Sequence, residues 1–310
     1  MEFLLTSVGI AILILGANWL VSGASFLAMR LGVSKLIVGL SIVAFGTSLP
    51  ELVSSLVSAF KGYTSIAISN VVGSNLANVG LCLGLASFFR SIPVKKSTIK
   101  AELPFMILAT ISFIALFLKN YSLSWNDGVV FLSFMAIFMY YLVTSAREVV
   151  EEELKEIKEQ KSVLFSVFMI ILGIFALWFG GNLAIENVVR IAKRFNLSQA
   201  FVGLTIVAVG TSLPELMVSI VSTVKKESDI LIGNIVGSNI FNILLILGTS
   251  SLFSKLTVDV PSYSMDLGFL LATSILIFVF ALSKKRISRL EGIVLFAIYV
   301  VYVYLISGRG

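Results

Sequence analysis

The sequence predicts an all-α membrane protein with ten transmembrane helices, arranged as two inverted five-helix repeats. Three observations lead to this prediction. Of the 310 residues, 58% are hydrophobic and only 13% are charged, whereas soluble domains carry roughly a quarter charged residues. The apolar residues fall into ten long runs, and the two halves of the chain repeat each other at a fixed shift. This composition excludes a water-soluble globule.

The ten apolar runs are each long enough to cross a hydrocarbon layer as a helix. Lipid offers no partner to an unpaired backbone group, so the spans must be helical. The first run lacks a preceding basic segment and is too long for a signal peptide, which makes it the first span. The predicted spans cover residues 3–28, 36–60, 63–89, 101–118, 126–146, 162–188, 198–223, 230–254, 266–283 and 290–307.

A second copy of the first half appears 164 residues later. Residues 38–57, VGLSIVAFGTSLPELVSSLV, match residues 202–221, VGLTIVAVGTSLPELMVSIV, at 15 of 20 positions. The same shift aligns residues 70–78, NVVGSNLAN, with residues 234–242, NIVGSNIFN. One constant shift in separate segments indicates a duplicated five-span unit.

Five is odd, so the second copy enters the membrane from the opposite side. We therefore expect a first repeat at 1–146, a cytoplasmic linker at 147–161 and a second, inverted repeat at 162–310. Many secondary transporters share this architecture, with the substrate site near the midplane where the repeats meet.

The basic residues predict the orientation. Of the 23 lysines and arginines, 16 fall in the odd-numbered connections between spans, which places those connections in the cytoplasm and both termini outside the cell membrane. Loops facing anionic lipid headgroups account for the net charge of +6, so no nucleic-acid partner is expected. The expected assembly is a monomer.

The chain has no histidine and a single cysteine, Cys82. These counts exclude a disulfide framework, a histidine zinc site and a Ser-His or Cys-His catalytic pair. An intramembrane enzyme is therefore disfavoured, and no cofactor is expected.

Glu51 and Glu215 are the only charged residues in their spans and lie near the middle of them. A charged side chain there costs at least about 2.5–3.5 kcal/mol, so it normally faces a cavity or a partner. No lysine or arginine lies inside the core of any span to serve as that partner. Cations from solution, either metal ions or protons, must neutralise the two carboxylates.

A proline precedes each of these glutamates, in the segments GTSLPE at 46–51 and 210–215. Because proline has no N–H and crowds the preceding turn, both helices should break or kink there. The break would expose carbonyls at 44–47 and 208–211 beside the hydroxyls of Thr47, Ser48, Thr211 and Ser212. Both segments also match the Ser-x-x-Glu capping box, and we expect capping in addition to ion binding.

The third and eighth spans add oxygen ligands at repeat-related positions. Ser74 and Asn78 lie four residues apart and share a helical face, as do Ser238 and Asn242. These four side chains are expected on the cavity side. Small and amide residues also hold membrane helices together, and this packing role is the expectation for Asn75 and Asn239.

The donor set contains oxygen atoms only. Calcium prefers six to eight oxygen ligands in flexible geometry, whereas magnesium keeps its waters and demands a tight octahedron. One Ca²⁺ would balance the two carboxylate charges, and several Na⁺ ions could do the same. Mutually exclusive occupancy by the two kinds of ion is the requirement for antiport.

The paired GTSLPE and GSN-x-x-N segments resemble the repeats of the Ca²⁺/cation antiporter superfamily, most closely those of prokaryotic sodium/calcium exchangers. The resemblance covers the whole chain and implies electrogenic exchange of several Na⁺ for one Ca²⁺ by alternating access, with the first and sixth helices sliding across the others. The ion ligands that it implies are the carbonyls of Ala44 and Ala208, together with Thr47, Ser48, Glu51, Ser74, Asn78, Thr211, Ser212, Glu215, Ser238 and Asn242.

Three alternatives to Na⁺/Ca²⁺ exchange are weighed at this stage. A proton/calcium antiporter would use the same site, but its relatives usually carry a further acid in a GN-x-x-E pattern that this chain lacks. Potassium-dependent relatives carry aspartate at the position of Asn242, so the asparagine argues against K⁺ transport. A passive cation channel is disfavoured by the inverted duplication around one acidic pair.

Overall fold

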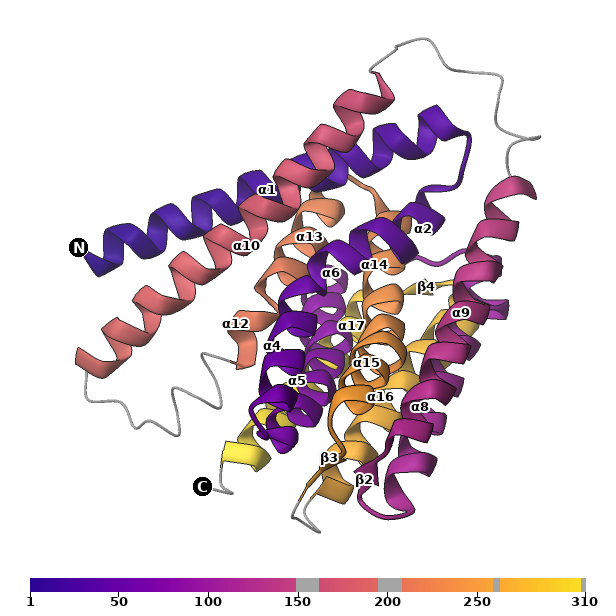
Figure 1. Ribbon diagram of the computed structural model, residues 1–310. Coiled ribbons are helices and arrows are strands. Elements are labelled where there is room, and N and C mark those ends of the chain that lie inside the picture. The colour runs from indigo at the N-terminus through magenta and orange to yellow at the C-terminus, as the bar shows by residue number, and fades with distance from the viewer. Residues whose placement is uncertain (149–161, 195–207, 259–262, 308–310) are drawn as a thin grey trace.

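The computed structural model of the chain describes residues 1–148, 162–194, 208–258 and 263–307 (Figure 1). These residues form helices, connecting turns and loops, and four strands of two residues each. Within them, eight helices are long and apolar enough to cross a membrane, or nine when the bent pair Lys35–Thr47 and Leu49–Phe60 counts as one span. The all-helical membrane class is confirmed. The tenth span stays a prediction, because residues 198–223 lie partly outside the described ranges.

Two long helices, α1 (Glu2–Leu31) and α10 (Val163–Arg194), pack against each other. Figure 1 shows them side by side, running diagonally past the other helices. Glycines make this close approach possible. A Cβ atom added to Gly9 would lie 2.9 Å from the carbonyl oxygen of Gly180, and one added to Gly16 would lie 2.9 Å from that of Gly173. Small residues of this kind let membrane helices meet backbone to backbone.

The other helices of the first half follow α1 along the chain. Gly32, in the left-handed conformation at φ 65°, ends α1. The subsequent elements are α2 (Lys35–Val38), the π-helical η1 (Gly39–Val43), α3 (Ala44–Thr47), α4 (Leu49–Phe60), α5 (Thr64–Leu76), the π-helical η2 (Ala77–Leu83), α6 (Gly84–Phe89), β1 (Ile92–Pro93), α7 (Lys96–Lys100), α8 (Glu102–Leu118), β2 (Ser122–Leu123) and α9 (Trp125–Glu148).

The second half repeats this order after α10. Its described elements are α12 (Ala208–Thr211), α13 (Leu213–Val224), α14 (Ser228–Phe241), the π-helical η5 (Asn242–Leu247), α15 (Gly248–Phe253), β3 (Leu256–Thr257), α16 (Tyr263–Lys284), β4 (Arg286–Ile287) and α17 (Arg289–Ser307). The 164-residue shift carries both bounds of α3, α4, α6, β1 and β2 onto those of α12, α13, α15, β3 and β4.

The strands pair across the two halves. β1 is antiparallel to β4, with Ile92 opposite Ile287, and β2 is antiparallel to β3, with Leu123 opposite Leu256. Each strand therefore pairs with the repeat counterpart of the other strand in its own half. A twofold relation between the halves produces this crossed pairing of strands.

The buried apolar side chains form two separate clusters. The smaller one joins Leu20 of α1 and Leu177 of α10 to Val43 of η1 and Val218 of α13. The larger one fills the space among the remaining helices and includes Phe113 and Phe138. The pair α1 and α10 thus packs through an apolar cluster that is separate from the larger one and shared with η1, α13 and α14.

Candidate functional site

The predicted breaks occur where the sequence places them. The helix formed by α2, η1 and α3 turns by 46° at Ser48 before α4 continues it. Pro50 and Pro214 stand in the first turns of α4 and α13. Because neither has an N–H to donate, the chain bends instead of continuing as one straight helix.

The expected capping boxes at these breaks are wrong. Neither Ser48 nor Ser212 makes a side-chain cap hydrogen bond. A true N-cap has extended backbone geometry, as at Ser34 with φ −66° and ψ 143°, whereas Ser48 has φ −83° and ψ 2°. The hydroxyl of Ser48 therefore leaves the first-turn N–H groups of α4 uncapped.

The same Ser-x-x-Glu pattern does form a box elsewhere in the chain. At the start of α17, Glu291 accepts a hydrogen bond from the Ser288 N–H at 2.6 Å, and the Glu291 N–H donates to the Ser288 hydroxyl at 3.4 Å. Identical residue types thus cap a helix at its end and stay unbonded at the mid-span break. The glutamates and serines at the break remain available for another role.

Glu51 and Glu215 are buried, with 0% and 1% of their surface exposed. Among the described residues, no side chain or backbone group forms a hydrogen bond of normal geometry with any of their four carboxylate oxygens. The ion pairs found among the described residues all involve acids other than Glu51 and Glu215. The two carboxylates interact electrostatically with each other. Two neighbouring buried charges without a protein cation form a site that only external cations can balance.

Hydroxyl groups of the first half lie close to both carboxylates. Ser74 of α5 interacts with Glu51, whereas Thr47 and Ser48 of the first half interact with Glu215 of the second. Ser212 of the second break is also buried. Hydroxyl oxygens next to a carboxylate are ligands that suit both calcium and sodium.

The expectation of a freed carbonyl at Ala44 is wrong. Its oxygen accepts the Ser48 N–H at 3.0 Å, as in a continuous helix. The Thr47 hydroxyl, at 3.3 Å, and the Ser238 hydroxyl of α14, at 3.4 Å, also donate to it. Proline removes the donor that would bind the Gly46 carbonyl, not the one that binds Ala44. Ala44 and Ser238 nevertheless meet across the two halves.

Four asparagines join the third and eighth predicted spans. Asn75 donates from Nδ2 to the Asn239 carbonyl oxygen at 3.2 Å and accepts from Asn242 Nδ2 at 2.9 Å. Asn78 donates from Nδ2 to Asn239 Oδ1 at 3.5 Å. The Oδ1 atoms of Asn78 and Asn242 are buried and accept no hydrogen bond from the described residues. The amides of both predicted ligands are thus anchored by nitrogen and keep their oxygen available.

Two further asparagines belong to the site and were not among the predicted ligands. Asn234 Oδ1 accepts the Thr47 hydroxyl at 3.0 Å, which ties the first break to α14. Asn70 donates from Nδ2 to the main-chain carbonyl oxygen of Glu51 at 3.2 Å and to the Ser55 hydroxyl at 2.9 Å. Their recurrence at the 164-residue shift, at the head of both GSN segments, was the signal that could have found them.

Helix packing places each glutamate helix of one half against the asparagine-bearing segment of the other half. The Glu51 helix α4 packs against η5, which begins with Asn242, and the Glu215 helix α13 packs against η2, which holds Asn78. Thr211 lies at the second break beside Ser212. The Ala208 backbone begins α12, and its side chain lies outside the described structure.

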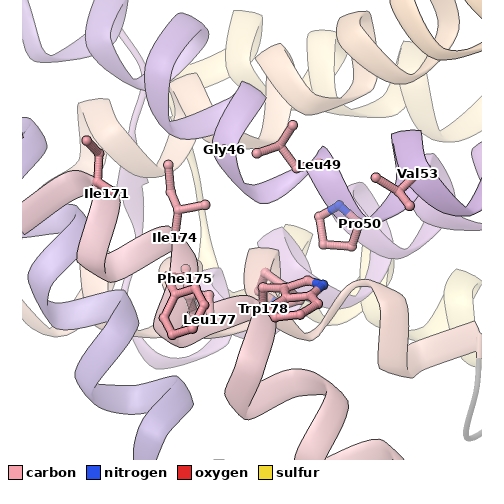
Figure 2. A pocket seen from close by; sticks show the side chains of 10 residues that line it. Gly46, Leu49, Pro50, Val53, Ile171, Ile174, Phe175, Leu177 and Trp178 are labelled. Atoms are coloured by element: carbon pink, nitrogen blue, oxygen red, sulfur yellow. The ribbon is translucent and has the colours of Figure 1, made fainter.

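An apolar cavity of about 480 Å³ lies beside the breaks (Figure 2). Gly46, Leu49 and Pro50 line one wall, and Ile174 and Trp178 of α10 face them. None of the predicted ligands lines this cavity. This cavity is therefore not the candidate ion site. The candidate is the oxygen-rich centre between α4, α13 and the segments α5–η2 and α14–η5.

Comparisons with known proteins identify the family. A model of the family described as sodium/calcium exchanger protein matches residues 1–144 and 165–308. The chain belongs to this family. Sodium/calcium exchanger MaX1 of Methanosarcina acetivorans is 30% identical over 97% of this chain and 97% of its own length. Inner membrane protein YrbG of Escherichia coli K12 is 32% identical over 92% of this chain and 89% of its own length.

A solved structure has the same fold. The sodium-calcium exchanger NCX_Mj soaked with 2.5 mM Na⁺ and 0.1 mM Ca²⁺ matches with a TM-score of 0.84 at 31% identity, covering 98% of this chain and 97% of that one. This exchanger-family chain is accordingly a membrane transporter of cations, as the resemblance found in the sequence implied.

Proposed function

We propose that this member of the exchanger family is an electrogenic antiporter that exchanges Na⁺ for Ca²⁺ across the cell membrane. The observation that carries the proposal is the pair of buried, mutually interacting carboxylates of Glu51 and Glu215, which lack a protein cation among the described residues. One Ca²⁺ neutralises both charges. Exchange of more than two Na⁺ for each Ca²⁺ would move net charge across the membrane.

The proposed ligands surround these two carboxylates with oxygen. Hydroxyls and amides already interact with the carboxylates or reach across the two halves, which supports their role. The full proposed set is Glu51, Glu215, Thr47, Ser48, Thr211, Ser212, Ser74, Asn78, Ser238, Asn242 and the carbonyls of Ala208 and Ala44. The Ala44 carbonyl would bind an ion once the Thr47 and Ser238 hydroxyls turn away from it. Such a flexible all-oxygen set fits Ca²⁺ better than Mg²⁺.

Transport through this site requires a conformational change. Glu51 and Glu215 are closed off from water in the structure, so an ion reaches them only after a rearrangement. The apolar cluster of α1 and α10 is separate from the larger cluster, so a sliding of this pair across η1, α13 and α14 would leave the larger cluster intact. Alternating access of a fixed midplane site is the transport mode of inverted-repeat proteins.

The proposed topology has ten spans, with repeats at 1–146 and 162–310 joined by a cytoplasmic linker at 147–161, and with both termini outside. Contacts between connections support the alternation. Odd-numbered connections meet through the ion pairs Lys35–Glu227 and Lys95–Asp229 and the strand pair β1–β4. Even-numbered connections and the N-terminus meet through Thr64–Thr257, β2–β3 and Arg194–Glu2.

The proposed exchange is tested in proteoliposomes by uptake of ⁴⁵Ca²⁺. An outward Na⁺ gradient at equal internal and external pH should drive uptake. An inside-positive potential should speed this uptake when more positive charge leaves than enters, and an inside-negative potential should slow it. Uptake driven by a pH gradient, with no response to Na⁺, would instead assign proton coupling. Flux without any counter-ion would assign a channel.

A further inference from the structure

The amide of Asn75 can take only one orientation in this structure. One of its two terminal atoms lies 3.2 Å from the main-chain carbonyl oxygen of Asn239. A carbonyl oxygen only accepts hydrogen bonds, so the atom facing it must be the NH₂ group.

This orientation decides what the neighbouring ligand position can hold. With Nδ2 bound to Asn239, Asn75 presents its oxygen to residue 242, and it accepts the Asn242 NH₂ group at 2.9 Å. If the amide turned over, two oxygens would face each other at Asn239. Residue 242 must therefore donate a hydrogen bond, which a carboxylate cannot do.

We propose that Asn75 is a specificity-determining residue that admits an amide and rejects a carboxylate at position 242. It fixes Asn242 by its nitrogen, so the buried Asn242 oxygen is the atom left to bind a cation. It also restricts the fixed charge of the site to Glu51 and Glu215. Asn75 acts through Asn242 and is a positioning residue. This inference rests on the proposed cation exchange and deepens it.

Position 78 is the repeat counterpart of position 242. Its neighbour Asn239 is less restricted in orientation than Asn75, which provides a matched control. Asn239 accepts Asn78 Nδ2 at 3.5 Å, at the limit of a hydrogen bond. The Asn239 NH₂ group itself donates only to the sulfur of Met106 at 3.6 Å among the described residues, and thioether sulfur is a weak acceptor. Asn239 can therefore turn its amide and donate to a carboxylate at position 78 at little cost.

The test compares Asn242→Asp with Asn78→Asp, because both add one carboxylate to the same site. Na⁺-driven ⁴⁵Ca²⁺ uptake at one fixed pH gives the apparent KM and the maximal rate of each variant. We expect the KM of Asn242→Asp to exceed that of Asn78→Asp at least roughly tenfold, since its carboxylate faces the Asn75 oxygen. Equal KM values for the two variants would overturn the proposal.

We expect Asn75→Ala to change the KM in opposite directions in the wild-type and Asn242→Asp backgrounds. Alone, Asn75→Ala should raise the KM, because Asn242 loses its anchor. In the Asn242→Asp background the same change should lower the KM, because it removes the opposing oxygen. A loss of packing alone would be harmful in both backgrounds, and that result would refute the inference. In the control background, Asn239→Ala should raise the KM of Asn78→Asp further.

Two measurements separate the possible failures. Should Asn75→Ala not fold, as judged by gel filtration in detergent, Asn75→Ser replaces it, because serine is too short to present an oxygen to position 242. Wild-type protein without Na⁺-driven uptake would refute the proposed exchange, and Ca²⁺-dependent stabilisation of the purified variants, read as the change in Tm with added Ca²⁺, would then test the amide selection by itself. Wild-type uptake without the sign reversal would refute the inference alone.

Discussion

Neutralising either buried glutamate should abolish calcium transport while leaving the fold intact. Glu51→Gln and Glu215→Gln keep the size of the side chain and remove one negative charge from a site whose carboxylates are 0% and 1% exposed. One pair of unit charges about 4 Å apart interacts by about 4 kcal/mol at an effective dielectric constant of ~20, and a divalent ion doubles that value. Relief of carboxylate desolvation offsets part of this loss.

Even if the relief offsets half of the loss, about 4 kcal/mol remains, which is a roughly thousandfold loss of Ca²⁺ affinity. Na⁺ carries half the charge, so its binding should weaken less. The assay is ⁴⁵Ca²⁺ uptake into proteoliposomes, with protein quantity and Tm measured in parallel. Glu102→Gln is the matched control, because Glu102 is also a buried acid but accepts a hydrogen bond from Tyr141 at 2.5 Å. Near wild-type uptake by both site variants would show that the site lies elsewhere.

Two further pairs of substitutions test the packing and the breaks. A Cβ atom on Gly180 would lie 2.8 Å from the Gly9 carbonyl oxygen, whereas one on Gly181 would meet nothing closer than 3.8 Å. Gly180→Ala should therefore destabilise the protein by about 1–3 kcal/mol, seen as a lower Tm, and Gly181→Ala should not; equal Tm values would contradict the close helix contact. Ser288→Ala removes a cap and should lower stability by about 1 kcal/mol with transport retained. Ser48→Ala should leave Tm nearly unchanged and reduce Ca²⁺ uptake, and the opposite pattern would assign Ser48 a capping role.

Features that depend on local chemistry were predictable from the sequence. A proline removes one specific N–H wherever it stands, so the bend before Pro50 follows from that residue alone. A glutamate in a span without basic residues must be buried away from lipid, as Glu51 and Glu215 are. Family membership followed from the motifs that surround these residues.

Features that depend on tertiary contacts were not predictable in the same way. The partners of Asn75 lie more than 160 residues away in the sequence, and nothing local to Asn75 distinguishes packing from positioning. The capping box at Ser48 was expected from its residue types, but its backbone geometry is set by the bend. The π-helical segments η1, η2 and η5 have no sequence pattern of their own that separates them from ordinary helix.

Equilibrium binding of ⁴⁵Ca²⁺ to the purified protein tests most directly whether the two kinds of ion share one site. Increasing Na⁺ at constant ionic strength and pH should displace bound Ca²⁺ completely, and Glu215→Gln should bind little Ca²⁺ at any Na⁺ concentration. Bound Ca²⁺ that stays constant as Na⁺ replaces an inert monovalent cation would contradict competition for the two carboxylates.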